Sequence, residues 1–393
     1  MNSVKLLNAC EICTGKLDSN AAESGGKYPF FTCSPEPLKI NTYAFDEDAI
    51  LLAGNNAQGN FHIQRYNGKF NAYQRTYVIT AKSGWDIDFV KYSIEIALNH
   101  LKKIAQGSQT KFLTLGMLED FYLKDYSLDK QKQIAAPLKT IDDKIALNNH
   151  INDNLAQMLN LVYEQWFYRF EFPNAQNLPY KQSNGELEWN EKIKRHIPQG
   201  WKVQSMMSND LFSVISSGIE PFTSKRYYAT ADIIGSDIGE GSSIVYETRE
   251  SRANMQPAIY SVWFAKMKNS VKHLLLNPEM LSFIESSILS TGFYGLQCSE
   301  MSFEYISSVV SSPIFEATKD RLSHGATQQG ITDDDLANIS LLVPDEITLS
   351  KYHDATKGLY SQISNNILEN KRLIAIRNFL LPLLMNGQAI ILD

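Results

Sequence analysis

The sequence has few of the features that mark secreted, membrane-spanning or metal-binding proteins. It contains 4 cysteines in 393 residues, too few for a disulfide framework. Cys10 and Cys13 form one CxxC pair without a second pair at zinc spacing, so we expect both to be apolar residues of a first strand. No apolar run reaches the roughly 18 residues of a membrane helix, and no signal peptide opens the chain. We therefore expect a cytoplasmic protein with no membrane partner.

Motifs for nucleotide-dependent catalysis are also missing. There is no GxxxxGK[ST] loop for ATP, and neither a Gly-rich loop nor an Asn-Pro-Pro-aromatic motif for adenosylmethionine-dependent methylation. The seven histidines show no metal-ligand spacing. Pro344-Asp345 followed by Glu369-Asn370-Lys371 resembles a nuclease PD…ExK pattern only formally, because that site uses strands and Glu369 falls on a predicted helix. We expect a non-catalytic chain with no metal and no cofactor of its own.

The charge balance gives a weaker indication. The formal net charge is -6 at pH 7, which argues against a protein that coats nucleic acid by charge alone. It leaves open sequence-specific binding by two localised clefts, especially if partner subunits supply positive charge.

The clearest pattern present lies in residues 131–167, which contain no glycine and no proline after Pro137. Residues at alternating steps of four and three form a coiled-coil seam that includes two central asparagines. A buried Asn can fix register and partner choice, because an unpaired amide in an apolar seam is costly; alternatively, both asparagines face water. The seam of this helix contains Ile134, Leu138, Ile141, Ile145, Asn148, Asn152, Leu155, Leu159, Val162 and Trp166.

The same pattern returns 218 residues later, so the protein contains a repeat of itself. The front parts of the two halves match more loosely, with a shift of 183 that places Asn71 on Asn254 and Tyr77 on Tyr260. Each half therefore reads as a globular region followed by a long helix. Pairs related by 218 include Gly107 and Gly325, Leu123 and Leu341, Ile145 and Ile363, Asn148 and Asn366, and Asn152 and Asn370.

We expect an α+β fold with a pseudo-two-fold internal repeat, in which two globular α/β domains are separated by two long antiparallel coiled-coil helices. The expected parts are a first domain (1–127), a first helix (128–170), an extended connector (171–200), a second domain (201–348) and a second helix with the C-terminal tail (349–393). Within the domains we expect strands at 43–53, 73–81, 211–216, 243–246 and 258–265, and helices at 88–105 and 278–289. The second helix should end at a Gly387 C-cap.

A two-fold axis near His150 would make Asn148 face Asn370 and Asn152 face Asn366. A second apolar stripe lies off this seam, and one helix pair cannot bury both. Two copies of a partner helix would cover it; alternatively, the globular domains fold back over it. The predicted seam is Ile141, Ile145, Asn148, Asn152, Leu155, Leu359, Ile363, Asn366, Asn370 and Leu373, and the predicted partner-docking stripe is Met158, Leu161, Ile376, Phe379 and Leu383.

Four segments in this order resemble the specificity subunit of a type I restriction-modification enzyme: YNGKFNAYQRTYVI (66–79), IDDKIALNNHINDNLAQMLNLVYEQWF (141–167), IPQGW (197–201) and LLPLLMNGQ (380–388). The resemblance covers essentially the whole chain. It implies that each globular domain is a target recognition domain for one half of a bipartite, asymmetric site in double-stranded DNA, with the helices setting the spacer. It also implies two methyltransferase subunits that use S-adenosylmethionine and two restriction subunits that use ATP and Mg.

Polar loops with interleaved aromatic residues are the candidate DNA-reading elements. Asn and Gln can bond adenine, and Arg and Lys can bond guanine, in the major groove; alternatively, the loops are polar because they face water. The loops at 106–110 and 324–328 could position a phosphate or be tight turns that need glycine. The first-domain candidates are Asn55, Asn56, Gln58, Asn60, His62, Arg65, Lys69, Asn71, Tyr73, Gln74, Arg75, Gln109 and Thr110. The second-domain candidates are Thr223, Ser224, Lys225, Arg226, Tyr227, Arg249, Arg252, Asn254, Gln256, Thr327 and Gln328.

Two other functions fit parts of the sequence. A non-enzymatic coiled-coil scaffold, whose two globular domains bind protein partners, would explain the helices equally well. Salt-sensitive, sequence-selective DNA binding would distinguish the two hypotheses. A stand-alone restriction enzyme would need a catalytic centre that the sequence does not contain.

Overall fold

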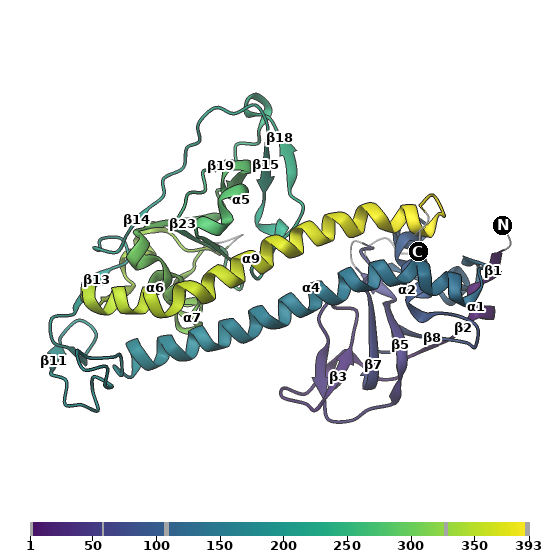
Figure 1. Ribbon diagram of the computed structural model, residues 1–393, viewed down its shortest axis with the longest axis horizontal. Coiled ribbons are helices and arrows are strands. Elements are labelled where there is room, and N and C mark those ends of the chain that lie inside the picture. Colours follow the sequence, from purple (N-terminus) through teal and green to yellow (C-terminus); the bar gives the residue numbers. More distant parts are fainter. Residues whose placement is uncertain (1–2, 57–58, 106–109, 326–328, 390–393) are drawn as a thin grey trace. The chain divides into compact units, whose positions relative to one another are not determined.

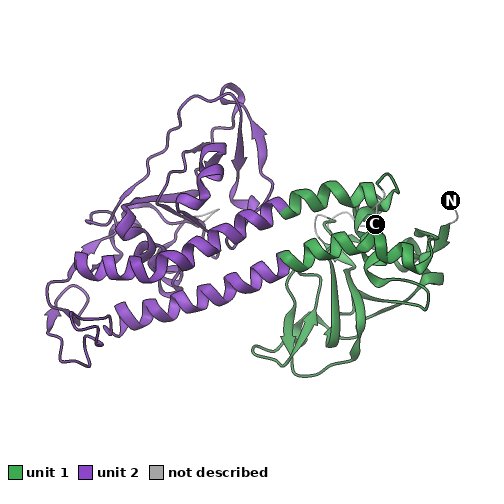
Figure 2. Ribbon diagram, in the orientation of Figure 1, with its two compact units in different colours: residues 1–144, 373–393 green, residues 145–372 purple. Residues whose placement is uncertain are grey.

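A computed structural model of the protein describes residues 3–56, 59–105, 110–325 and 329–389. The chain divides into two compact units, residues 1–144 with 373–393 and residues 145–372 (Figure 2). The two long helices are α4 (Leu128–Tyr163) and α9 (Glu346–Met385) (Figure 1). Each contributes residues to both units (Figure 2). Neither these helices nor any other helix among the described residues is long and apolar enough to cross a membrane.

The ends of the long helices follow from local sequence. Helix α4 starts at Leu128 with Asp129 in its first turn, where a carboxylate is favourable beside the helix dipole. It continues after Tyr163 into a π-helical turn, η2 (Glu164–Tyr168). Helix α9 ends at Met385, and Gly387 then adopts a φ of 71° while its N–H donates to the Leu384 carbonyl at 3.1 Å. The C-cap predicted at Gly387 is therefore present.

The first unit is a mixed sheet covered by helix α2 (Ile87–Ile104). Asp86 caps this helix by accepting a hydrogen bond from Phe89 N at 2.9 Å. One face of α2 packs on the sheet, and Phe89 and Tyr92 on another face pack against the long helices. The sheet order is β2-β8-β5-β7-β3-β4, with β2 (Cys10–Thr14), β8 (Thr76–Ala81), β5 (Phe45–Ala53), β7 (Ile63–Ala72), β3 (Tyr28–Phe31) and β4 (Leu38–Ile40). The remaining elements are β1 (Ser3–Lys5), α1 (Leu6–Ala9), η1 (Ser19–Ala21), β6 (Asn55–Asn56), β9 (Lys111–Phe112), α3 (Leu115–Glu119) and β10 (Tyr122–Lys124).

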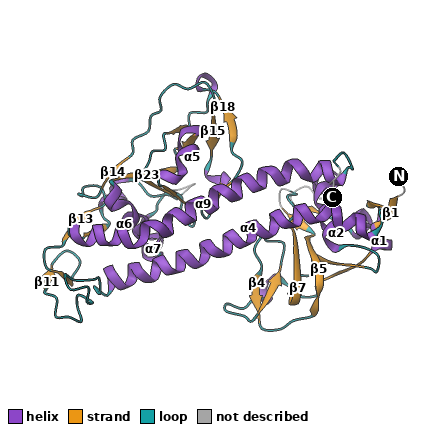
Figure 3. Ribbon diagram, in the orientation of Figure 1, coloured by secondary structure: helices purple, strands orange, loops and turns teal. Residues whose placement is uncertain are grey.

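The second unit has a central sheet of order β14-β23-β20-β21 and a second sheet of order β18-β15-β22-β19. Figure 3 labels β14 and β23 of the central sheet and β15 and β18 of the second sheet. The strands of the central sheet are β14 (Phe212–Val214), β23 (Phe293–Cys298), β20 (Ser261–Ala265) and β21 (His273–Leu276). Those of the second sheet are β18 (Ser242–Ile244), β15 (Lys225–Tyr228), β22 (Ser287–Ser290) and β19 (Ala253–Met255). Helices α6 (Glu300–Ser311) and α7 (Pro313–Leu322) contribute Phe303 and Phe315 to the core beside the central sheet.

Shorter elements complete the second unit. They include the two-stranded pairs β11 (Leu187–Asn190) with β12 (Arg195–Pro198), β13 (Lys202–Ser205) with β24 (Ser340–Val343), and β16 (Ile233–Ile234) with β17 (Asp237–Ile238). The short helices are η3 (Thr230–Asp232), η4 (Tyr246–Thr248), η5 (Pro278–Met280), α5 (Leu281–Ser286) and α8 (Asp333–Ala337).

Three expectations about local structure need correction. Residues 287–289 were expected to be helical but belong to strand β22, because the chain leaves the helix at Ser286 to pair with β15 and β19. The connector contains the hairpin β11–β12 and buries Phe172 and Ile197 in the main core of the second unit, so it is not simply extended. Cys10 is buried on β2 as expected, whereas Cys13 is exposed.

The internal repeat extends into the sheets, but not with the shift of 183. The strand orders show that β8 corresponds to β23 and β5 to β20. Tyr77 therefore matches Tyr294, and each hydroxyl donates a hydrogen bond, to the Leu113 carbonyl at 3.0 Å and to Asp333 at 2.9 Å respectively. Asn254 lies on β19 of the second sheet and is not the counterpart of Asn71. The predicted shift of 183 is wrong because the halves carry insertions of different length, so no single shift holds across their strands.

Candidate nucleic-acid interface and helix seam

In the second unit, α4 and α9 meet through buried carboxamides. Asn148 Nδ2 donates to Asn370 Oδ1 at 2.9 Å, and both residues are buried. Asn366 Nδ2 donates to Asn152 Oδ1 at 2.8 Å. These are the two pairings that the sequence predicts, and the alternative that the asparagines face water is wrong.

Two further polar residues take part in this contact and were not predicted. Glu369 Oε2 accepts a second bond from Asn148 Nδ2 at 2.7 Å, and Asn149 Oδ1 accepts from Asn370 Nδ2 at 2.6 Å. Each lies one residue beside a seam position, so the step-of-four-and-three pattern missed it. Of the other seam residues, Ile145, Leu155, Leu359 and Ile363 are half-buried in the second unit, and Ile141 and Leu373 are half-buried in the first.

The predicted docking stripe is solvent-exposed in both units. Met158 and Leu161 of the second unit are 51% and 65% exposed. Ile376 and Phe379 of the first unit are 48% and 68% exposed, and Leu383 is half-buried. Each unit by itself therefore leaves most of its own part of this apolar surface uncovered. Apolar residues exposed together on a helix commonly mark an interaction site.

The amide-rich loop of the first unit is built on the short strand pair β6–β9. Asn55 and Asn56 are half-buried on β6 and pair with Phe112 and Lys111 of β9. Asn60 is exposed and accepts a bond from Lys102 Nζ at 2.6 Å. His62 is half-buried, and burial lowers the pKa of its imidazole. Gln58 and Gln109 lie outside the described residues.

Two lysines flank this loop and were missed by the sequence analysis. Methylene carbons of Lys102 and Lys111 lie against the position that a side chain at Gly59 would occupy. Lys102 is in the last turn of α2, and Lys111 is the first residue of β9. The signal that could have identified them is their closeness in sequence to the segment 106–110, where a phosphate contact was predicted.

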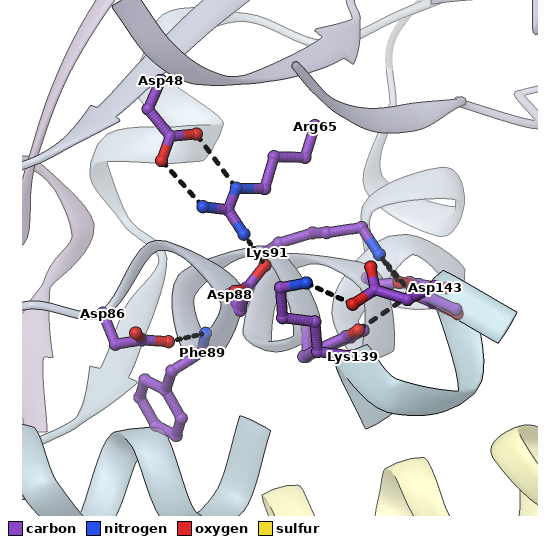
Figure 4. A network of polar contacts seen from close by, with 11 residues as sticks. Asp48, Arg65, Asp86, Asp88, Phe89, Lys91, Lys139 and Asp143 are labelled. Carbon is purple, nitrogen blue, oxygen red and sulfur yellow. Dashed lines mark hydrogen bonds and ion pairs between the residues drawn. The ribbon is translucent and has the colours of Figure 1, made fainter. Parts of the chain in front are cut away.

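Arg65 on β7 is held by protein carboxylates (Figure 4). Its Nε and Nη2 donate to the two oxygens of Asp48 at 3.0 and 2.7 Å, and its Nη1 donates to Asp88. The hydrogen bonds to Asp48 are the main reason that the pKa of Arg65 is raised. The two guanidinium nitrogens of Arg65 that could bind a guanine edge side by side are thus already bound to Asp48.

The other first-domain candidates divide into exposed and buried residues. Gln74 and Arg75 are exposed where β7 turns into β8, and Tyr73 beside them is half-buried. Lys69 is exposed, with its ammonium 4.6 Å from the centroid of the Tyr43 ring. Asn71 is buried, and its Oδ1 accepts from Ala72 N at 3.0 Å. Thr110 is exposed.

The second-domain candidates lie mainly on and beside the second sheet. Thr223, Ser224 and Arg252 are exposed, and Asn254 is half-buried. Arg226 donates to the carbonyls of Glu240 and Gly241, and Tyr227 is buried beside it. The Arg249 guanidinium stacks 4.0 Å from the Tyr246 ring centroid. Lys225 and Gln256 line an open pocket of about 720 Å³, together with Glu220 and Glu285. Thr327 and Gln328 lie outside the described residues.

Parts of the sequence are similar to known proteins. The family model "Type I restriction modification DNA specificity domain" matches residues 1–157. The specificity subunit of the type I restriction enzyme EcoDI of Escherichia coli is 40% identical over 139 residues, covering 35% of this chain and 30% of that protein. The MjaIX specificity subunit of Methanocaldococcus jannaschii is 25% identical over 308 residues, covering 74% of this chain and 65% of that protein.

The fold has a solved counterpart. The S subunit of a type I restriction-modification system from M. genitalium superposes with a TM-score of 0.53 at 13% identity, covering 98% of this chain and 95% of that one. The chain thus shares its architecture with a solved structure over nearly its full length. The matches to the EcoDI and MjaIX subunits span less than two thirds of their lengths. Residues 1–157 thus resemble the DNA specificity domain of type I restriction-modification enzymes, and the fold of the whole chain is similar to that of a solved type I S subunit.

Proposed function

We propose that this chain is the DNA-recognition subunit of a type I restriction-modification complex, in which each globular domain binds one half of a bipartite, asymmetric site. The observation that carries the proposal is a repeated scaffold with different surface chemistry. Four neighbouring strands of the first sheet, β2-β8-β5-β7, correspond in order to the second unit's central sheet, β14-β23-β20-β21. The positions that follow β5 and β20 differ, with Asn55 and Asn56 in one half and Met267 and Lys268 in the other. A shared scaffold with different contact residues suits two domains that read different base pairs.

The long helices act as the ruler between the half-sites, because half-site spacing follows from protein geometry. Pairing of buried amides supports this role, since a shifted register would leave Asn148 and Asn370 without partners at a cost of about 1–3 kcal/mol for each buried group. A fixed register gives a fixed, unspecific spacer.

The exposed stripe supports docking of two methyltransferase subunits, one at Met158 and Leu161 and one at Ile376 and Phe379. These subunits bring S-adenosylmethionine and flip out the adenine that they methylate in each half-site. Two restriction subunits bring ATP and Mg for cleavage. This chain supplies no catalytic group, and the partners supply positive charge that a chain of net charge -6 lacks.

A selection experiment tests the proposal. The chain, purified with its methyltransferase subunit, is incubated with a library of randomised DNA duplexes, and bound duplexes are sequenced at two salt concentrations. We expect one split motif with a constant spacer and binding that weakens steeply with salt. Stable assembly of the two proteins without enrichment of any motif would contradict the proposal and favour the coiled-coil scaffold.

A further inference from the structure

The strands shared by the two sheets match in individual backbone hydrogen bonds at the ends of β5 and β20. Ala53 N donates to the His62 carbonyl at 2.9 Å, as Ala265 N does to Lys272 at 3.1 Å. Gly54 N donates to the Arg75 carbonyl at 2.8 Å, as Lys266 N does to Gly292 at 2.9 Å. The carbonyl of Gly54 accepts from Leu113 N at 2.8 Å, as that of Lys266 accepts from Ile331 N at 3.0 Å.

These bonds fix which residues of the second half match the amide-rich loop of the first. Asn55 pairs with Phe112 just as Met267 pairs with Gly330. Asn56 pairs with Lys111, and Lys268 N donates to the Gln329 carbonyl at 3.0 Å. Met267 and Lys268 are thus the structural counterparts of Asn55 and Asn56. The corresponding connection between β20 and β21, residues 266–272, has the sequence KMKNSVK with three lysines.

The β20–β21 connection has the chemistry of a DNA contact. Met267 and Val271 are 41% and 55% exposed. The Lys266 ammonium lies 5.3 Å from the Tyr294 ring centroid, and Lys268 is half-buried and forms no ion pair with any described residue. An exposed apolar side chain beside a lysine offers contacts to a thymine methyl and to a guanine edge.

Buried contacts hold this connection in place from beneath. Lys319 of α7, fully buried, donates to the Ser270 carbonyl at 3.0 Å and pairs with Glu316 at 2.6 Å. Asn269 N donates to Asp320 Oδ1 at 2.9 Å. A loop that is fixed before binding presents its side chains at little entropic cost.

We propose that the second domain reads its half-site through the β20–β21 connection, with Met267 and Lys268 as the specificity-determining residues and Lys266 and Lys272 beside phosphates. This inference rests on the proposed function. The base-reading face of the second domain then lies on the β20–β21 connection and not on the predicted segment that contains Arg249 and Arg252.

The test uses the complex of this chain with its methyltransferase subunit and the double variant M267A/K268A, with R249A/R252A as the matched control. Methylated sites are mapped for each complex. We expect M267A/K268A to lower discrimination at one or two base pairs of a single half-site about tenfold, while the other half-site and the spacer stay unchanged. The control should retain the complete motif. The unchanged half-site also shows that the variant is folded and assembled.

Several results would overturn the inference. If the complex with M267A/K268A methylates the unchanged motif, the inference is wrong. This holds whether or not R249A/R252A alters a half-site. Loss of one half-site in the control alone would return the reading face to the second sheet. If the unaltered complex shows no motif, the proposed function itself fails, which is a different result from a motif that M267A/K268A leaves intact. If M267A/K268A abolishes assembly, the variant K268N, which keeps a polar side chain, must change the half-site for the inference to stand.

Discussion

Asn148 and Asn370 form a buried amide–amide hydrogen bond of 2.9 Å across the helix pair, and Asn148 also donates to Glu369 at 2.7 Å. We expect N148L to lower the free energy of unfolding by about 1–3 kcal/mol, because it removes the hydrogen bonds that Asn148 donates to Asn370 Oδ1 and to Glu369. Urea unfolding of the purified chain measures the change. The double variant N148L/N370L should recover part of this loss, since it also removes the orphaned amide. If both variants are as stable as the parent, the amides do not define the register.

Arg377 of α9 binds both Asp142 of α4 and Glu95 of α2 in the first unit, and its side chain is 13% exposed. Its replacement by Met should destabilise the protein by on the order of 2 kcal/mol at pH 7. The two largely buried carboxylates keep Lys91 as a partner but lose the Arg377 guanidinium. Thermal and urea unfolding measure this loss. A stability unchanged within error would show that the ion pairs are not formed in solution.

The cost of R377M should depend on pH through Asp142. Burial alone would raise the pKa of Asp142, but the charges of Lys91 and Arg377 outweigh it and the pKa is lowered. Because its pKa is lower in the folded protein than in the unfolded chain, ionised Asp142 stabilises the fold at pH values above the unfolded-state pKa of about 3.9. This stabilisation is lost as the pH falls through the folded-state pKa. The stability difference between parent and R377M should therefore shrink below about pH 4. A difference that grows on acidification would contradict this assignment.

Lys371 of α9 lies under Tyr228, with its ammonium 4.4 Å from that ring centroid. Burial, with a smaller effect of Arg226, lowers the pKa of Lys371 to about 8. Between about pH 8 and 10.4, Lys371 is protonated in the unfolded chain but largely neutral in the folded protein. The unfolded chain therefore binds more protons, and the free energy of unfolding increases as pH rises through this range. K371M should lack that gain. Parallel pH-dependent slopes for parent and variant would refute a buried, perturbed lysine.

The exposed apolar stripe gives a prediction about assembly. L161D and F379D should each weaken co-purification with the methyltransferase subunit, because a carboxylate would be buried in an apolar contact. Both side chains are more than half exposed, so the fold itself should be unaffected. The control is E346Q at the start of α9, outside the stripe. Unchanged co-purification of both Asp variants would place the docking surface elsewhere.

The long helices and their register could be predicted because their signal is periodic and repeated. A seam residue needs only its own helix to be recognised, and the mirrored positions of Asn148 and Asn370 follow from the internal repeat. Glu369 was not predicted because it lies one residue beside the seam. Only the three-dimensional structure shows that it accepts a hydrogen bond from Asn148.

The globular parts were less predictable because their contacts join distant segments. Helix α6 was not predicted, since its buried face carries Glu304 and Ser308, which bond His353 and two tyrosines of α9 and so break the apolar pattern. Arg65 resembled a DNA contact in sequence, but Asp48 is 17 residues away in the chain and only the pairing of β5 with β7 brings it close. Strand order, which the sequence did not reveal, also decided which loop matches Asn55.

The proposed function requires one chain to read two different half-sites at a fixed distance. A map of methylated adenines tests this requirement, taken across the genome of a host that expresses this chain with the proposed methyltransferase subunit. We expect one asymmetric motif of two parts with a constant spacer, methylated on both strands and absent without this chain. Methylation that is absent, or scattered without a motif, from a host that contains the assembled complex would contradict it.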